Sequence, residues 1–444
     1  VPTVLYVTSS SADGLYGTGD ILGILVFTSD TVTVTGTPQL TLETGASDET
    51  VNYSSGSASS VLVFNYTVAT DNANSDLDYA STGALALNGG TINDTAGNPL
   101  TLTLATPGAA NSLAANKALV IDAAAPTNQN TVFASSVVDQ GGDTITIVSS
   151  ATASNEVWFA PAGTTSFSAG ATMTEAASGT ATSIAAPANE GTYYIYVIDQ
   201  AGNVSSASTA TLTVDNTAPT NQNNVFPSAA SETVGGSVTI VSSGAVTNEV
   251  WIAPAGTSSF SAGSTMTEAS SGTATTMTAP TSAGTYYIYV IDAAGNISSA
   301  STAALTVGTA GFTLGSISGT VAETATTATF TVVLDAEPDS NVVISVTSAD
   351  TGEATVSAGT LTFTTGNWDS AQTITVTGVN DALADGSQST TITMAVVDAS
   401  SDNNFDSLAD QTVTATTTDN ETAGFTLSKT AAIVTNSGGT DTFT

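Results

Sequence analysis

The residues of this sequence that could do chemistry are almost all carboxylates. Asp and Glu number 38, against 2 basic residues, Lys117 and Lys429, and the formal net charge is -36. Clustered carboxylates without basic partners repel one another, and their hard oxygen atoms suit calcium. Calcium is therefore the first cofactor that the sequence predicts.

Several candidate calcium ligands lie in short loops between strands and at two joints. The loops 94–98, 199–203 and 292–296 place Asp, Gly and Asn at the same offsets, near the joint acids Asp122 and Asp215. Each loop has two interpretations: a source of calcium oxygens, or a tight turn in which Asp accepts backbone N–H groups and Gly takes a positive φ. We favour the turn for each loop taken alone. The nearby joint acids make the calcium interpretation more nearly equal to it.

The densest acidic stretch, 71–78, lacks the central Gly and final Glu of an EF-hand loop. A solvated loop and a calcium site completed by Asp13 are equally open here, and the loop 398–406 has the same two interpretations. The candidate metal ligands from these loops and joints are Asp13, Asp71, Asp76, Asp78, Asp122, Asp199, Asp215 and Asp292.

The same composition excludes several classes of function. Without His or Cys, no Ser-His or Cys-His nucleophile can be assembled. The triplet 350–352 spells Asp-Thr-Gly, but an aspartic protease needs two such carboxylates and the sequence holds one copy. Binding of nucleic acid or of an anionic membrane surface needs clustered Lys and Arg. We therefore expect no catalytic residues, no nucleic-acid partner and no membrane insertion, and we expect a mature or internal segment of an extracellular protein.

Tryptophans offer one more candidate chemistry, the stacking of aromatic faces on sugars. Trp158 and Trp251 each follow Asn-Glu-Val, and Trp368 lies further along. A repeated position within a strand is more typical of a sandwich core than of a carbohydrate platform. We predict that these side chains are core.

Internal repeats identify the elements that must position these residues. The hexapeptide at 125–130 recurs at 218–223, and the same offset relates 193–199 to 286–292, so two domains are twins. A second repeat relates 310–314 to 423–427, and Phe330-Thr331 to Phe443-Thr444. It predicts that another domain begins near residue 422.

Strand patterns fill the chain between these repeats. Segments such as 31–35, 61–66 and 373–377 are rich in β-branched residues, and in most of them apolar and polar residues alternate. No segment shows the hydrophobic period of a helix. Gly, Asn, Asp and Pro punctuate the chain at the spacing expected of sandwiches. The joints 122–126 and 215–219 are short and contain Pro. The fold class predicted is all-β, a linear array of Ig-like antiparallel β-sandwich domains forming an extended rod.

Three resemblances refine this picture. Residues 1–122 resemble the bacterial Ig-like repeats of giant surface proteins through Val32 to Leu42, Asp76 to Tyr79 and Leu85 to Ile92. The twin domains, with their D-x-x-G-N hairpins and V-D-x-x-A-P joint, look like shorter bacterial Ig-like modules.

Residues 309–421 are similar to Calx-beta domains, through Val321 to Glu323, Phe330 to Leu334, Gly359 to Phe363 and Asn380-Asp381 before Asp385-Gly386. Such domains can bind calcium at one tip. The resemblance implies an acidic tip formed by Glu323, Asp350, Asp381 and Asp385, with Asp419 near the exit strand. Asn380 and Gln388 stand where the pattern often has acids.

The predicted domains are 1–122, Ig-like; 123–215 and 216–308, Ig-like repeats a and b; 309–421, Calx-beta-like; and 422–444, the incomplete start of a second Calx-beta-like domain. The function predicted is an adhesive or structural stalk on a bacterial cell surface, stiffened by calcium at acidic loops and joints. The alternative is a self-assembling filament or surface-layer subunit joined by strand donation from 422–444. A polysaccharide-binding accessory is the third hypothesis. The partners expected are neighbouring copies or further domains, with surface glycans or another cell as candidate targets.

Overall fold

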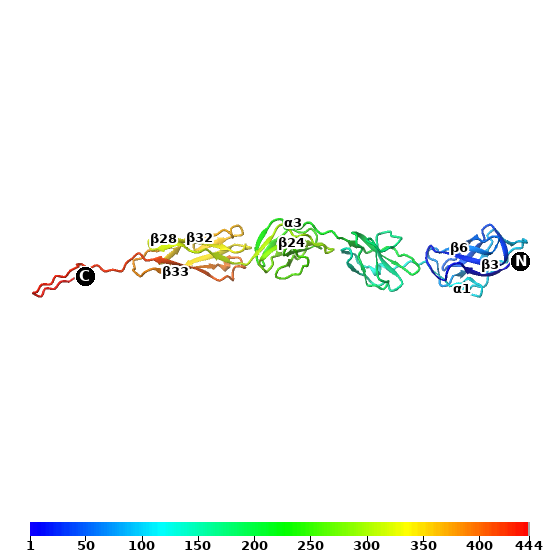
Figure 1. Ribbon diagram of the computed structural model, residues 1–444, viewed down its shortest axis with the longest axis horizontal. Coiled ribbons are helices and arrows are strands. Elements are labelled where there is room, and N and C mark those ends of the chain that lie inside the picture. The colour runs from blue at the N-terminus through cyan, green and yellow to red at the C-terminus, as the bar shows by residue number, and fades with distance from the viewer. Residues whose placement is uncertain (443–444) are drawn as a thin grey trace. The chain divides into compact units, whose positions relative to one another are not determined.

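The computed structural model describes residues 1–442 and divides into two compact units, 1–217 and 218–444. Strands dominate both units and form several separate sheets (Figure 1). The predicted all-β fold of tandem sandwiches is thereby confirmed. Phe443 and Thr444, which the sequence repeat matches to Phe330 and Thr331, lie outside the described residues. Among residues 1–442, no helix is long and apolar enough to span a membrane.

The first sandwich, whose strands run from β1 (Val4–Ser9) to β11 (Leu119–Asp122), is built around the long strand β3 (Ile21–Thr35). Its larger sheet has the order β1-β3-β6-β5-β4-β8, with β10 on β3 and β9 on β4, and its smaller sheet has the order β2-β11-β7. Alternate residues of β3 and β6 are buried, so both strands send one face into the core. The other elements are β1 (Val4–Ser9), β2 (Gly14–Tyr16), β4 (Gln39–Glu43), β5 (Glu49–Ser55), β6 (Ser59–Thr67), β7 (Ala73–Asn74), β8 (Asp78–Tyr79), β9 (Leu85–Ala86), β10 (Thr91–Asp94), α1 (Leu113–Asn116) and β11 (Leu119–Asp122).

The second and third sandwiches share one topology, as their sequence repeat predicts. Each has a five-stranded sheet and a two-stranded sheet, with strand orders β12-β18-β17-β14-β15 and β13-β16 in the second and β19-β25-β24-β21-β22 and β20-β23 in the third. The elements of the second are α2 (Gln129–Val132), β12 (Val137–Asp139), β13 (Thr144–Thr146), β14 (Glu156–Ala160), β15 (Thr174–Glu175), β16 (Ser183–Ala185), β17 (Gly191–Ile198) and β18 (Leu212–Val214). Those of the third are α3 (Gln222–Val225), β19 (Ala230–Thr233), β20 (Ser237–Thr239), β21 (Glu249–Ala253), β22 (Thr267–Glu268), β23 (Thr276–Thr278), β24 (Gly284–Ile291) and β25 (Leu305–Gly308).

Trp158 and Trp251 are buried, as predicted, on β14 and β21. Trp251 belongs to a small cluster with Tyr289 that is separate from the main core of its sandwich, and Phe260 packs against it. The indole nitrogen of Trp251 donates to Glu249 at 2.9 Å, so the buried ring has a polar partner. Trp368 is partly buried against the core of the fourth sandwich.

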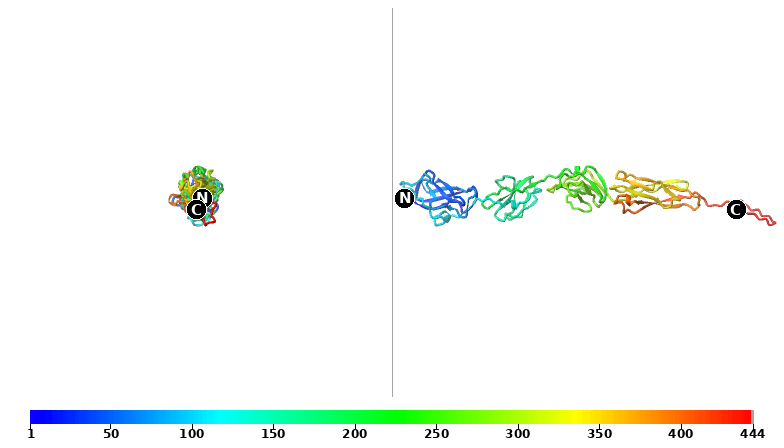
Figure 2. Two further views of the ribbon diagram at one scale, coloured as in Figure 1. Left: turned by 90° about the vertical axis from the view of Figure 1, so that its left-hand side faces the viewer. Right: turned by 180° about the vertical axis from the view of Figure 1, so that it is seen from behind.

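The fourth sandwich, residues 309–421, contains a nine-stranded sheet that folds around one core. Its strand order is β30-β32-β28-β27-β34-β33-β29-β31, with β26 on β28, and the strands run along the length of this sandwich (Figure 2). The elements are β26 (Phe312–Leu314), β27 (Ser318–Ala322), β28 (Thr326–Leu334), β29 (Val342–Ser348), β30 (Ala354–Val356), β31 (Thr360–Phe363), β32 (Gln372–Gly378), β33 (Gln388–Val396), the 3-10 turn η1 (Asp398–Ser400) and β34 (Gln411–Thr418).

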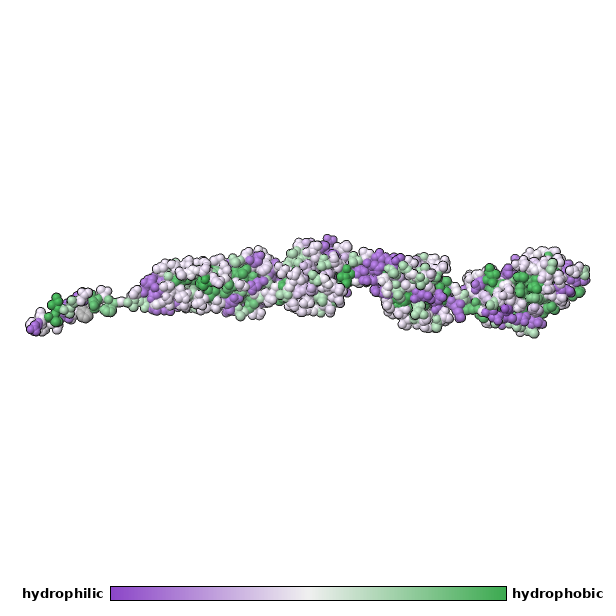
Figure 3. Space-filling view, viewed as in Figure 1, coloured by the Kyte–Doolittle hydropathy of each residue, from purple (hydrophilic) through white to green (hydrophobic). Residues whose placement is uncertain are grey.

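Two features depart from the strand-only expectation. Within residues 1–442, the three α-helices each contain a single turn, which is too short to produce a helical hydrophobic period. After β34, residues 423–442 form no strand, and hydrophobic surface (green) lies along this narrow tail (Figure 3). Phe425 and Ile433 are among its exposed apolar side chains. The start of a second Calx-beta-like domain in 422–444 stays a prediction.

Candidate metal centre

One end of the fourth sandwich brings two acids together through the pairing of β27 with β34. These strands are parallel neighbours, with Val321 opposite Thr417, so their carboxyl ends emerge side by side. Glu323 follows β27 and Asp419 follows β34. The backbone N–H of Glu323 donates to the carbonyl of Thr418 at 3.2 Å and continues the pairing one step further.

Glu323, Asp419 and Glu421 form the inner cluster: one carboxylate oxygen of each lies within 4.8 Å of the others. Glu323 is buried, with 3% of its surface exposed, and accepts a hydrogen bond from the backbone N–H of Asn420 at 3.3 Å. The N–H groups of Glu421 and Gly386 donate to the two oxygens of Asp419 at 2.6 and 2.7 Å. The backbone thus fixes these carboxylates close together.

Glu353, Asp381 and Asp385 form the outer cluster, with the same 4.8 Å limit between their oxygens. Glu353 precedes β30, whereas both aspartates lie on the loop between β32 and β33. The carbonyl of Glu353 accepts hydrogen bonds from Val379 N–H at 2.9 Å and from the hydroxyl of Thr417 at 3.0 Å. Thr417 is the penultimate residue of β34, so the outer cluster adjoins the inner one.

The pKa values record the mutual repulsion of these acids. The pKa of Glu421 is raised to about 7, first by the facing carboxyl of Glu323 and then by desolvation. The pKa of Glu353 is raised by desolvation and by Asp385 and Asp381. That of Asp419 is lowered, because its carboxylate accepts the N–H groups of Glu421 and Gly386. A bound cation would replace repulsion with attraction at each cluster.

The donor set of both clusters suits a hard divalent cation. Calcium takes six to eight oxygen ligands in flexible geometry, whereas transition metals favour His and Cys, which this sequence lacks. Three carboxylates offer up to six oxygens, and waters and backbone carbonyls can complete the shell. In each cluster, the residues present fit calcium.

Four of the predicted ligands therefore meet in two clusters: Glu323 and Asp419 in the inner one, and Asp381 and Asp385 in the outer one. Asp350 lies outside both; its carboxylate accepts Gly352 N–H at 2.8 Å, and its charge contributes to the raised pKa of Glu353.

Sequence reasoning missed Glu353 and Glu421. The signal for Glu421 was its place two residues after Asp419, next to the same strand end. Glu353 lies three residues after Asp350 and gave no separate signal.

The acids predicted in the first sandwich have different surroundings. Asp78 is buried, and its carboxylate accepts the backbone N–H groups of Tyr79, Leu113 and Gly108 at 2.9, 3.2 and 2.9 Å. Asp13 lies 3.8 Å from the ammonium group of Lys117. Asp76 is exposed. Among residues 1–442, the two clusters of the fourth sandwich are the groups of three acids with oxygens this close.

The D-x-x-G-N hairpins adopt the turn that was favoured for them. Asp199 accepts the N–H groups of Ala201 and Asn203, each at 2.9 Å, and Gly202 takes φ of 81°. Asp292 accepts the N–H groups of Ala294 and Asn296 at the same distances. The carboxylates of these turns are held by N–H donors of their own loops.

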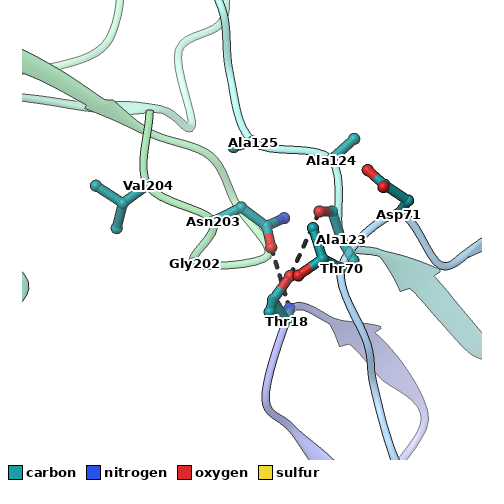
Figure 4. Close-up of a pocket in the computed structure, with 9 residues that line it drawn as sticks. All are labelled: Thr18, Thr70, Asp71, Ala123, Ala124, Ala125, Gly202, Asn203 and Val204. Carbon is teal, nitrogen blue, oxygen red and sulfur yellow. Dashed lines mark hydrogen bonds between the residues drawn. The ribbon is translucent and has the colours of Figure 1, made fainter. Parts of the chain in front are cut away.

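The joint between the first and second sandwiches uses an amide side chain (Figure 4). Asn203 accepts the backbone N–H of Thr18 at 3.0 Å and donates to the carbonyl of Asp122 at 2.7 Å. The carboxylate of Asp122 accepts Ala124 N–H at 3.2 Å. Asp71 has φ of 69° and lines the adjacent cavity of about 590 Å³. At the next joint, the carboxylate of Asp215 accepts Thr217 N–H at 2.9 Å.

Comparisons with known proteins give distant likenesses. No protein-family model and no curated protein matches the sequence. Among solved structures, domains 1–6 of the surface layer protein SbsC match at 13% identity, with a TM-score of 0.22, over 98% of this chain and 56% of that one. The chain thus spans about half the length of that structure. Chicken CNTN1 FN1–FN3 domains match at 11% identity and a TM-score of 0.23, over 69% of this chain and 99% of that one.

Titin domains I67–I69 match at 9% identity and a TM-score of 0.18, over 95% of this chain and 99% of that one. All three are arrays of domains. At these TM-scores, similarity to the solved structures shows no function for this chain.

Proposed function

We propose that this chain is a structural segment of an extracellular bacterial surface protein, in which calcium stabilises the end of the fourth sandwich. The observation that carries the proposal is the meeting of two three-carboxylate clusters at that end, in a sequence with 2 basic residues. Carboxylates this close repel one another unless they share a proton or bind a cation. Dissociation constants for calcium that approach the millimolar range are typical of extracellular modules. The resemblance to Calx-beta domains supports the same assignment.

Calcium held by the inner cluster would act where the chain leaves β34. Glu421 is the last residue of the predicted fourth domain, and Asp419 is held by Glu421 N–H at 2.6 Å. A cation shared by Glu323, Asp419 and Glu421 would tie the chain that leaves β34 to the body of the sandwich. We propose that calcium stiffens this exit, as a surface stalk requires. Adhesion to surface glycans or to another cell stays a prediction.

Calcium titration of the full chain tests the proposal. We expect isothermal titration calorimetry to show binding in the micromolar to millimolar range, and calcium to raise the melting temperature of the transition that includes the fourth sandwich. The double variant Glu323→Gln, Asp419→Asn should lose the part of both signals that comes from the inner cluster. Asp410→Asn, an exposed acid of the same sandwich outside both clusters, is the matched control. Equal melting temperatures in calcium and in chelator would contradict the proposal.

The alternative, assembly by strand donation, has one observation in its favour. Phe312 is 3% exposed in β26, which pairs with β28, whereas its repeat counterpart Phe425 is 86% exposed. Residues 423–427 therefore carry the side chains of a core strand without a core around them. Light scattering over a range of protein concentration separates the two proposals, because strand donation requires mass to grow with concentration and a stalk segment does not.

A further inference from the structure

The third and fourth sandwiches make direct contacts that the metal clusters do not involve. Ser237 N–H donates to the carboxylate of Asp339 at 3.2 Å, and the side-chain amide of Asn404 donates to the hydroxyl of Thr233 at 2.9 Å. A Cβ placed on Gly308, in the last strand of the third sandwich, would lie 2.9 Å from the methyl group of Ala336. The two sandwiches are therefore closely packed at this junction.

Glu232, on β19, brings a half-buried side chain to this junction. Its Oε2 atom is buried and has no hydrogen-bond donor among the described residues, 1–442. The groups that face it from the fourth sandwich are all acidic: Asp339, Glu337 and Asp402. From its own sandwich, the hydroxyl of Thr233 and the backbone of Gly236 lie nearby. No cation faces it, since the two basic residues of the sequence, Lys117 and Lys429, form ion pairs with Asp13 and Asp441.

Asp402 holds the facing loop in place. It is buried, with 4% of its surface exposed, and its carboxylate accepts the backbone N–H groups of Asp339, Ser340 and Asn404. These hydrogen bonds hold the backbone of Asp339, Ser340 and Asn404 around the Asp402 side chain. The Asp339 side chain accepts Ser237 N–H from the third sandwich, which keeps it on the side of Glu232. The carboxylate of Asp339 thus lies next to a carboxyl group that lacks a donor.

We propose that the junction between the third and fourth sandwiches is a proton-dependent latch, closed when Glu232 is protonated and donates to the carboxylate of Asp339. The proton supplies the donor that the buried oxygen lacks. Its loss leaves the carboxylates of Glu232, Asp339, Glu337 and Asp402 near one another at the junction without a counter-charge. The junction then opens.

The direction of the pH effect follows from the surroundings of Glu232. Burial, and next the carboxyl of Asp339, raise its pKa to about 8 from the ordinary value of 4.5. The native junction therefore keeps the proton at pH values where the opened or unfolded chain releases it. The stabilisation is fully present below about pH 4.5 and is lost as the pH rises through about 8. The latch is closed in neutral water and opens in alkaline conditions.

Distance measurement between the two sandwiches tests the latch. The sequence has no Cys, so Ser264→Cys and Ser407→Cys, both at exposed positions, can be labelled specifically with spin labels or fluorophores in the full chain. In chelator, we expect a narrow distance distribution at pH 6 and a broad one at pH 9.5, with the midpoint near pH 8 and unchanged circular dichroism. Equal distributions at both pH values would overturn the latch.

Two variants identify the group that titrates. Glu232→Gln carries a permanent amide donor for Asp339, so it should keep the narrow distribution at pH 9.5. Glu268→Gln removes an exposed acid of the same sandwich and should keep the pH dependence of the parent chain. A Glu232→Gln protein that still opens between pH 6 and pH 9.5 would show that another group controls the junction. If the junction opened only when calcium was in the buffer, the proposal that a proton controls it would also be wrong.

Discussion

Carboxylates of the first sandwich and those at the end of the fourth sandwich differ in how close they lie to other carboxylates. Asp78 accepts three backbone N–H groups, whereas Glu323, Asp419 and Glu421 have carboxylate oxygens within 4.8 Å of one another. Asp419 also accepts two backbone N–H groups, so N–H donors occur at both places. An acid close to other acids gains more from a cation than an acid without such neighbours. Acidic residues alone therefore do not indicate metal; the carboxylates around each one decide.

The largest expected effect concerns Asp78. Asp78→Ala leaves three backbone N–H groups near a buried position without their acceptor, and we expect it to destabilise the first sandwich by about 3 kcal/mol or more. The loss should be the same in calcium and in chelator. Hydrogen exchange of the full chain, followed in residues 39–43 and 78–79, measures the local opening. Asp76→Ala, an exposed neighbour, should change stability by about 0.5 kcal/mol or less. If the loss of stability in Asp78→Ala depended strongly on calcium, Asp78 would not differ from the clustered acids of the fourth sandwich.

The sequence allowed the sandwiches to be predicted, because strand patterns and repeats depend on neighbouring residues. In β28, alternate side chains from Ala328 to Leu334 are buried, as the two-residue period of a strand with one face on the core predicts. The twin sandwiches repeat every strand and even the one-turn helix before the first strand. The D-x-x-G-N turns are local too, since Asp199 accepts hydrogen bonds within its own loop.

The candidate site was predicted only in part, because it depends on strands that pair far apart in the chain. Glu323 meets Asp419 through the parallel pairing of β27 with β34, which no local pattern encodes. Glu353 joins the outer cluster by the same kind of long-range packing. Asp78 shows the reverse case: its sequence context is acidic and polar, but Gly108 and Leu113 supply donors from a distant loop.

The next effect concerns the pH dependence of calcium binding. The raised pKa of Glu421, about 7, means that a proton must leave before calcium binds at lower pH. We expect affinity at the inner cluster to fall about tenfold per pH unit below 7. Without calcium the sign reverses, because the cluster holds its proton more tightly than the unfolded chain, so its contribution to stability is lost as pH rises from about 4.5 to 7.

Calorimetry at pH 8, 7 and 6 measures this dependence. Glu421→Gln should bind calcium more weakly at pH 8 and show a flatter pH profile, while Asp410→Asn should behave as the parent chain does. A calcium affinity that is constant from pH 8 to pH 6 would show that protons do not compete with calcium at the inner cluster. The inner cluster would then not differ from the turn acids in this respect.

A smaller effect is expected at the joint of the first two sandwiches. Asn203→Ala removes one acceptor for Thr18 N–H and one donor to the Asp122 carbonyl, and we expect it to weaken the coupling of the two sandwiches by about 1 kcal/mol. Asn98→Ala is a matched control, because Asn98 occupies the same turn position in an exposed hairpin. Thermal unfolding of both variants, with calcium and with chelator, gives the difference. Equal effects of the two substitutions would mean that the joint contacts contribute nothing beyond the turn.

The smallest effect concerns an exposed turn acid, Asp94, which supplies the opposite sign of pH dependence. The pKa of Asp94 is lowered by the side-chain amide and the backbone N–H of Asn98. A lowered pKa means that the turn stabilises the anion, so this stabilisation is present above the ordinary value of 3.8 and is lost as pH falls through the native value. Carboxyl titration by NMR should place the Asp94 pKa below 3.8 in the parent chain and closer to it in Asn98→Ala. If Asp94 titrated above 3.8 in the parent chain, the hydrogen bonds from Asn98 would not stabilise its anion.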